Sequence, residues 1–285
     1  MTRNEKRTAL VLGAGGLVGA GWEIGVLRGL ADAGTDLADA DLVVGSSAGA
    51  VVGAQLASGT PDLEELYERQ LSGAAPEPAA RLGISLVLRY AVAVLTSRTP
   101  EAYGRKVGAL ALGARTVGEA DRRETVARRL GPVLDWPARR LLVTAVDAVS
   151  GELVAYGADS GVPLTDAVTA SCAIPGLWPP ATIGGRRWID GGIHSTANAH
   201  LAAGYDRVVV IAPTARGNKV VLSPARQGAA LAAAGARVEV ITPDAASRKA
   251  FGRNPLDPAL RAAAARAGRA QAARHAVAVA AAWSA

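Results

Sequence analysis

The fold is decided by one stretch, Asp41-Leu-Val-Val-Gly-Ser-Ser-Ala-Gly-Ala50, which continues into Val51-Val-Gly-Ala54. Its apolar beginning, residues 42–44, predicts a short buried strand. The glycines and serines that follow predict a sharp turn, and residues 50–56 predict a helix. A serine on such a strand-to-helix turn is pushed out of the backbone. The stretch therefore predicts a β–α unit with Ser47 at its turn.

The spacing Gly-x-Ser-x-Gly makes Ser47 a candidate nucleophile. Gly45 and Gly49 flank it, where a larger Cβ would clash because strand and helix come so close. The N-terminal end of the helix adds partial positive charge and free N–H groups, which favour an oxyanion beside the serine. Because the chain has 33 glycines in 285 residues, the spacing can also arise by chance. The strand before it and the helix after it favour the nucleophile.

Length and composition favour one domain. A chain of 285 residues can form one large domain or two small ones, and no long Ser-, Pro- or charge-rich linker divides it. Half of the residues are apolar, which is enough for a substantial core. We expect a single domain over residues 1–285. It would comprise a catalytic core over about 8–213, followed by a C-terminal strand and an Ala/Arg-rich helix within 214–285.

The cysteine content and the net charge indicate in which cellular compartment the protein works and what it can bind. Cys172 is the only cysteine, so no internal disulfide can form, which fits a reducing compartment. The N-terminus does not match a signal peptide, and we expect a cytoplasmic protein, with peripheral membrane contact as an option. The net charge of +6 fits either a solvated arginine-rich surface or attraction to anionic lipid headgroups. The arginines are scattered without interleaved aromatic residues, so we expect no nucleic-acid partner.

A glycine-rich loop, Gly13-Ala-Gly-Gly-Leu-Val-Gly19, follows the first expected strand at 8–12. Strand, glycine loop and helix also begin a dinucleotide site, but Val18 stands where the third glycine of Gly-x-Gly-x-x-Gly belongs. The alternative use is an oxyanion hole formed by the amides of Gly15 and Gly16. Consecutive β–α units place their loops at the same edge of a parallel sheet, so this loop would lie beside the serine.

Apolar runs along the rest of the chain predict further elements. Strands are expected at 140–147, 152–156, 187–189, 207–212 and 237–242, and helices at 61–71, 119–130, 163–171 and from 258 to about 283. Residues 73–78 predict a loop, and the last strand is expected at an edge. Residues 84–95 are apolar around Arg89 and too short to span a bilayer. The favoured interpretation of these residues is a core helix, and the alternative is a lid over the serine that contacts lipid.

Asp190 is the second candidate for chemistry. It follows an expected strand and precedes Gly191 and Gly192. A partly buried carboxylate there could accept a hydrogen bond from Ser47, although Asp-Gly is also a common turn former. With an ordinary pKa of about 3.9, an aspartate needs desolvation before it can serve as the base.

The histidines do not settle which base the serine would use. The chain has only three, His194, His200 and His275. His194 and His200 follow Asp190 closely, but neither has a spacing that argues for a triad, and His275 lies in the arginine-rich tail. A Ser–His–Asp triad and a Ser–Asp dyad therefore both stay open on the residues alone.

Four motifs in order resemble the patatin-like phospholipases. They are the loop at 13–19, Gly-x-Ser-x-Gly at 45–49, Ala170-Ser-Cys-Ala-Ile-Pro-Gly176 and Asp190-Gly-Gly192, and the resemblance covers roughly residues 8–213. It implies a three-layer α/β fold, with a mainly parallel central sheet and helices on both faces. It also implies a Ser47–Asp190 dyad without a catalytic histidine, an oxyanion hole at Gly15 and Gly16, and lipid acyl hydrolysis without a metal or other cofactor.

The glycine loop departs from the family pattern, Gly-Gly-Gly-x-Arg/Lys-Gly. Ala14 replaces the first glycine and Val18 replaces the basic residue. The backbone donors survive both changes, but the lost charge favours a neutral ester or glycerolipid over a phosphate headgroup. We expect hydrolysis of carboxylic esters of lipids through an acyl-serine. The alternatives are a nucleotide-binding protein that uses Gly13–Gly19 and a non-catalytic lipid-binding module of the same fold.

Overall fold

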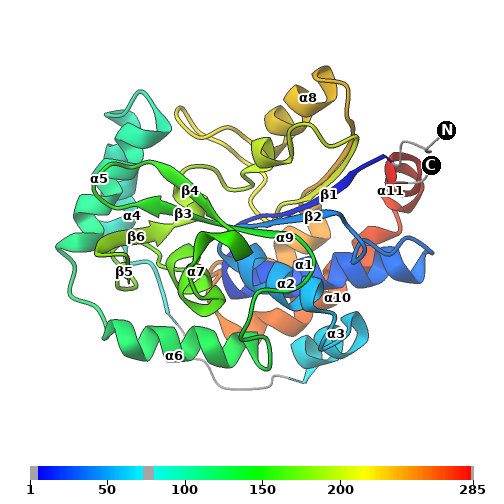
Figure 1. Cartoon of the computed structure of the whole chain (residues 1–285), viewed down its shortest axis with the longest axis horizontal. Coiled ribbons are helices and arrows are strands. Elements are labelled where there is room, and N and C mark those ends of the chain that lie inside the picture. The colour runs from blue at the N-terminus through cyan, green and yellow to red at the C-terminus, as the bar shows by residue number, and fades with distance from the viewer. Residues whose placement is uncertain (1–5, 73–79, 284–285) are drawn as a thin grey trace.

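A mixed sheet forms the centre of the computed structural model, which describes residues 6–72 and 80–283 (Figure 1). Eight strands of this described part pair in the order β5-β6-β3-β2-β1-β7-β8, with β4 added on β3. The strands are β1 (Thr8–Leu12), β2 (Leu42–Gly45), β3 (Leu141–Asp147), β4 (Leu153–Tyr156), β5 (Ala181–Ile183), β6 (Arg186–Asp190), β7 (Arg207–Ile211) and β8 (Arg237–Ile241).

Helices surround this sheet. They are α1 (Gly16–Asp32), α2 (Ala48–Ser58), α3 (Leu63–Leu71), α4 (Ile84–Leu95), α5 (Pro100–Leu112), α6 (Glu119–Leu130), α7 (Leu164–Ser171), α8 (Pro224–Ala233), α9 (Ala245–Phe251), α10 (Arg261–Ala272) and α11 (Ala276–Trp283). Figure 1 shows α1, α2 and α10 on one side of the sheet and α8 on the other.

The sheet is mainly parallel and buried on both faces. Strands β3, β2, β1, β7 and β8 run parallel, whereas β4, β5 and β6 make antiparallel pairs. Side chains of β1 alternate between two apolar clusters: Leu10 and Leu12 join residues of α1 and α2, while Ala9 and Val11 join Leu231 of α8. Strands covered on both faces consist of continuous apolar runs. The predicted α/β class, with helices on both faces of a mainly parallel sheet, is confirmed.

Two strands share one edge of β3. Val143 pairs both with Gly45 of β2 and with a residue of β4, so β2 and β4 lie on opposite edges of β3. Ala145 pairs both with Asp190 of β6 and with a residue of β4, so β6 also lies opposite β4. Strands β2 and β6 therefore lie end to end along one edge. The last residue of each strand points toward the last residue of the other.

The prediction of a core helix at residues 84–95 is wrong. These residues form α4, whose outward apolar side chains are exposed: Ile84, Val87, Leu88, Val92 and Leu95. The opposite face rests on the molecule, where the Tyr90 hydroxyl donates to the carbonyl of Pro175 at 2.5 Å. None of the helices within residues 6–72 and 80–283 combines the length and the hydropathy that a bilayer-spanning segment needs.

The C-terminal part is not one long helix. A turn at residues 273–275 separates α10 from α11. Helix α10 lies along α1 so closely that a side chain on Gly25 would overlap the backbone of Ala265. Helix α11 packs instead against β7 and β8, where Arg207 donates to the carbonyl of Trp283 at 2.8 Å. The chain bends because the two halves of the predicted helix cover different elements.

The helices α5, α8 and α9 and the short strand β5 were not predicted. Helices α5 and α8 both begin at a hydroxyl N-cap followed by proline, Thr99-Pro100 and Ser223-Pro224. This arrangement is a common helix start, because the side-chain oxygen accepts from a free N–H and proline suits the first helical position. The loop predicted at residues 73–78 lies outside the described residues.

Candidate active site

Ser47 occupies a strained turn between β2 and α2. Its backbone has φ of 53° and ψ of −113°, a conformation that residues other than glycine rarely adopt. A Cβ on Gly45 would lie 2.5 Å from the carbonyl oxygen of Gly49, and a Cβ on Gly49 would overlap the backbone of Leu12. Both flanking glycines are thus required by close approach, Gly45 to the start of α2 and Gly49 to the end of β1. The turn leaves the Ser47 side chain in a pocket.

The C-terminal end of α7 holds this turn in place. The N–H of Ser47 donates to Oγ of Ser171 at 2.8 Å. The Sγ of Cys172 donates to the carbonyl oxygen of Ser47 at 3.4 Å. The run Ala170-Ser-Cys-Ala-Ile-Pro-Gly176 therefore fixes both peptide groups of the candidate nucleophile, which gives a physical reason for its presence in the sequence.

Asp190 ends β6 beside this turn and is buried, with 5% of its surface exposed. Its Oδ1 accepts from the N–H of Gly192 at 2.8 Å. Burial raises the pKa of Asp190 to about 6, against the lowering effects of hydrogen bonding with the Ser47 side chain, the Gly192 amide and the charge of Arg122. The structure thus brings the two predicted side chains, Ser47 and Asp190, into contact.

A buried polar network lies beneath these two residues. The hydroxyls of Ser46 and Thr144 are 2.7 Å apart. The amide of Asn198 donates to Oγ of Ser46 at 2.9 Å and to the carbonyl of Gly191 at 3.1 Å. It therefore joins the residue before Ser47 to the residue after Asp190. Sequence analysis did not find Thr144 or Asn198, because no local pattern marks them.

The glycine-rich loop lies against the same turn. The carbonyl of Gly13 accepts from the N–H of Gly49 at 3.1 Å. The amides of Gly13 and Ala14 are used within the fold, donating to the carbonyls of Ile211 and Thr196.

The next two amides of the loop are not used in this way. Within the described part of the chain, the N–H groups of Gly15 and Gly16 donate to no acceptor. They stand at the N-terminal end of α1, and Gly16 lines the same pocket as Ser47. These are the two amides that the sequence predicted for an oxyanion hole.

The three histidines lie elsewhere. The rings of His194 and His200 are 5.8 Å apart, and burial lowers the pKa of both imidazoles. Nδ1 of His275 is 2.8 Å from a carboxylate oxygen of Glu239. In the part of the chain that the structure describes, no histidine hydrogen bonds to Ser47 or Asp190. The described residues also hold no group of three or more His, Cys, Asp or Glu side chains arranged for a metal ion.

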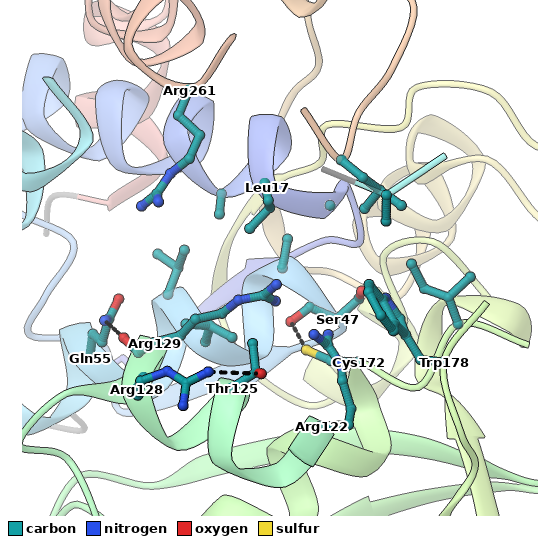
Figure 2. A pocket seen from close by; sticks show the side chains of 18 of the residues that line it. Leu17, Ser47, Gln55, Arg122, Thr125, Arg128, Arg129, Cys172, Trp178 and Arg261 are labelled. Carbon is teal, nitrogen blue, oxygen red and sulfur yellow. Dashed lines mark hydrogen bonds between the residues drawn. The ribbon is translucent and has the colours of Figure 1, made fainter. Parts of the chain in front are cut away.

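A pocket of about 500 Å³ opens in front of Ser47 (Figure 2). Helices α1 and α2 supply apolar side chains to one wall, including Leu17, Ile24 and Val51. Helix α6 lines another wall, and Trp178 lies near Ser47 with the guanidinium of Arg122 stacked over its ring, 4.3 Å from the ring centre. The pocket thus offers an apolar surface and a cationic surface to a molecule bound at Ser47.

Fold and site together define an α/β protein with a serine on a strained strand-to-helix turn beside a buried aspartate. A family model described as patatin-like phospholipase matches residues 10–203, which is more than half of the chain. The chain therefore belongs to the patatin-like phospholipase family. Membership of this family supports lipid hydrolysis as the class of function.

Similarity to individual proteins is distant. The crystal structure of VipD from Legionella pneumophila matches with a TM-score of 0.47 and 14% identity, covering 95% of this chain and 66% of VipD. The crystal structure of the type III effector protein ExoU matches with a TM-score of 0.37 and 17% identity, covering 95% of this chain and 53% of ExoU. This chain spans just under two thirds of the length of VipD and about half of the length of ExoU. No curated protein matches it.

Proposed function

We propose that this protein is a serine acyl hydrolase that cleaves carboxylic ester bonds of lipids through a Ser47–Asp190 dyad. One observation carries the proposal. The Ser47 side chain lies close enough to the buried Asp190 carboxylate to lower its pKa, next to two backbone amides without acceptors in the described chain. A nucleophile, a base and oxyanion donors at one point are the parts that acyl transfer requires.

The first half of the reaction transfers the acyl group to the serine. Oγ of Ser47 attacks the ester carbonyl carbon while Asp190 takes the hydroxyl proton. The amides of Gly15 and Gly16 donate to the developing oxyanion. When the tetrahedral intermediate collapses, the C–O bond to the alcohol breaks, and the leaving alkoxide takes the proton from Asp190. Burial supports the role of Asp190, because a pKa raised to about 6 makes it a stronger base than an ordinary aspartate.

The second half regenerates the enzyme. A water molecule attacks the acyl-serine carbonyl, and Asp190 accepts one of its protons. Collapse of the second intermediate breaks the bond between the acyl carbon and Oγ of Ser47, which recovers its proton from Asp190. The products are a free acid and an alcohol, and no electrons are exchanged.

The test uses a short nitrophenyl ester and two variants. Ser47→Ala and Asp190→Asn should each lower kcat by at least about a hundredfold, because each removes a group that acts in the transition state. Matched controls are Ser160→Ala and Asp159→Asn, whose side chains are exposed on the surface. They should behave as the wild type. Wild-type activity in either dyad variant would contradict the proposal.

Thermal stability with NAD(P) and binding to liposomes, measured beside ester hydrolysis, address the two alternatives. A nucleotide-binding protein would gain thermal stability from NAD(P) and hydrolyse no ester. A non-catalytic lipid-binding module would bind liposomes without turnover. Contacts within the glycine loop support the hydrolase, since Gly13 and Ala14 already use their amides inside the fold.

Peripheral contact with an anionic membrane is a second part of the proposal. Helix α4 presents an unpartnered apolar face, with Ile84 81% exposed and Leu88 61% exposed. Its inner face rests on the loop after α7, where Leu86 lies against Gly176. Ile174 and Trp178 of that loop line the pocket. A lipid surface that receives α4 would therefore lie next to the pocket, and the net charge of +6 favours anionic headgroups.

A further inference from the structure

The pocket in front of Ser47 carries an unusual concentration of arginine. Five arginines line it, drawn from three separate parts of the chain: Arg69, Arg122, Arg128, Arg129 and Arg261, hereafter the arginine wall. Among the described residues that line the pocket, the acidic side chains amount to Asp121 alone. The remaining surface is largely apolar, from α1 and α2. The charge of this lining therefore favours an anionic group on the bound molecule.

Two members of the arginine wall point into the pocket. Figure 2 shows Arg129 extending from α6 across the hollow, with Arg261 pointing into it from the opposite side. Nε and Nη2 of Arg261 both donate to the side-chain oxygen of Gln70, at 3.0 and 2.7 Å. This buried amide is a neutral acceptor and holds the planar fork of Arg261 in a fixed direction.

The other members have different surroundings. Arg69 and Arg128 each pair with a glutamate one helical turn earlier, at 2.6 Å in both cases. Arg122 is 3% exposed and lies at the Ser47 end of the wall, where its charge lowers the pKa of Asp190. Arg129 and Arg261 are the two members whose side chains Figure 2 shows reaching into the open part of the pocket.

The arginine wall changes the expectation drawn from Val18. The family places a basic residue at that position of the glycine loop, and its loss favours a neutral substrate. In the structure the Val18 side chain is fully buried among apolar residues. Cations reach the pocket from α3, α6 and the start of α10 instead. A guanidinium matches a phosphate with two parallel N–H···O bonds, which an ammonium cannot do.

We propose that the arginine wall binds a phosphate monoester on the substrate, so that the enzyme prefers lysophosphatidate-type esters to neutral glycerides. The acyl chain would lie along the apolar wall of α1 and α2, and the phosphate between Arg129 and Arg261. This inference rests on the proposed function for the reaction, but ligand binding by the arginine wall does not depend on turnover.

The first experiment measures binding without catalysis. Ser47→Ala is titrated by calorimetry with octanoyl lysophosphatidate and with octanoyl glycerol, which differ only in the phosphate. The phosphate ester should bind at least about tenfold more tightly, as expected for charge-assisted hydrogen bonds. Equal affinities would overturn the proposal. So would equal binding of octanoyl lysophosphatidylcholine, whose ammonium the wall should disfavour.

Two more ligands identify the source of the anion. Inorganic phosphate should bind at least about tenfold more weakly than octanoyl lysophosphatidate, because it lacks the chain that fills the apolar wall. Octanoate should bind weakly as well. If inorganic phosphate binds as tightly as the lipid, the pocket is a site for free phosphate. If octanoate binds as tightly as the lipid, the arginine wall is a site for a carboxylate. Either result would overturn the assignment.

Variants then locate the site. Arg129→Gln combined with Arg261→Gln, on the Ser47→Ala background, should reduce the phosphate preference to below about threefold, whereas Lys at both positions should restore part of it. The control is Arg123→Gln, which removes a charge of the same helix that pairs with Asp166 outside the pocket. It should keep the full preference. A preference that survives the double Gln variant would contradict the proposal.

Turnover gives the last readout. In the otherwise wild-type protein, the ratio of kcat/KM for the two octanoyl esters should fall by about tenfold in the double Gln variant. If the protein hydrolyses neither ester but binds the phosphate ester as described, only the proposed function fails. If it hydrolyses both equally and shows no binding preference, only the phosphate assignment fails.

Discussion

Ser47 and Asp190 meet because β2 and β6 run toward each other along one edge of β3. Gly45 and Asp190 pair with positions of β3 only two residues apart, Val143 and Ala145. The two strands do not pair with each other, so their relative position depends on β3. The polar network of Thr144, which lies between those two positions, reinforces this arrangement from below.

Hydrolysis should depend on the ionisation of Asp190. Its pKa is raised to about 6 by burial, and the base must be deprotonated to act. The value of kcat/KM for a nitrophenyl ester should therefore rise with pH, with a midpoint near 6 and a plateau above about 7. Arg122→Gln should move the midpoint upward, because the Arg122 charge lowers this pKa. A profile without a step between pH 4 and 8 would show that Asp190 is not the base.

The same burial should make Asp190 costly for stability at neutral pH. Its folded-state pKa exceeds the ordinary aspartate value of 3.8, so the folded protein binds this proton more tightly than the unfolded chain. As the pH rises from about 4 to 6, ionisation of Asp190 lowers the free energy of unfolding. Above about pH 6 the loss is complete and amounts to about 2–3 kcal/mol.

Asp190→Asn removes this loss. Relative to the wild type, its free energy of unfolding in urea should increase between pH 4 and pH 8. The surface control Asp159→Asn should show no such trend. A relative stability of Asp190→Asn that stays constant or decreases over this range would contradict the assigned pKa shift.

Asn198 should act as a positioning residue. Its amide joins Ser46 to Gly191, and it adopts a left-handed backbone conformation with φ of 54°. Asn198→Ala leaves buried partners unsatisfied and should lower stability by about 1–3 kcal/mol. It should also lower kcat with little change in KM, since the dyad loses its support.

A control separates support of the dyad from loss of stability alone. Asn218→Ala removes side-chain hydrogen bonds to the amides of Val220 and Val221, away from the dyad. Asn218→Ala should lower the melting temperature without lowering kcat. If Asn198→Ala and Asn218→Ala lower the melting temperature equally and both keep wild-type kcat, Asn198 has no positioning role.

The exposed face of α4 should control membrane binding. Ile84→Asp combined with Leu88→Asp places two charges on the outward face and should reduce sedimentation with phosphatidylglycerol liposomes by at least about tenfold. Hydrolysis of a soluble ester should persist. Val277→Asp alters an equally exposed apolar residue, at 83% exposure, on α11. Equal losses of liposome binding in both variants would argue against a role of α4.

The sequence predicts the central elements well, for a physical reason. Strands such as β1, β2 and β7 are buried on both faces, so each is an apolar run apart from Thr8 and Arg207 at the start of β1 and β7. The strained turn at Ser47 and the Asp-Gly-Gly end of β6 require glycine at fixed positions, so they leave local patterns. These local patterns are sufficient to select Ser47 and Asp190 from the sequence as candidates.

Other features depend on contacts between distant residues. Helix α4 has the composition of a core helix, and composition alone does not tell whether an apolar face meets protein or lipid. Asn198 and Thr144 are ordinary residues until folding brings them to Ser46. The arginine wall combines residues of α3, α6 and α10, and each arginine alone is indistinguishable from a surface charge in the sequence.

Covalent labelling tests the central claim most directly. The wild-type protein is treated with a fluorophosphonate, and the modified peptide is identified by mass spectrometry. We predict one adduct, on Ser47, that is absent in Ser47→Ala and forms at least about a hundredfold more slowly in Asp190→Asn. An adduct on another serine, or labelling of Asp190→Asn at the wild-type rate, would contradict the account.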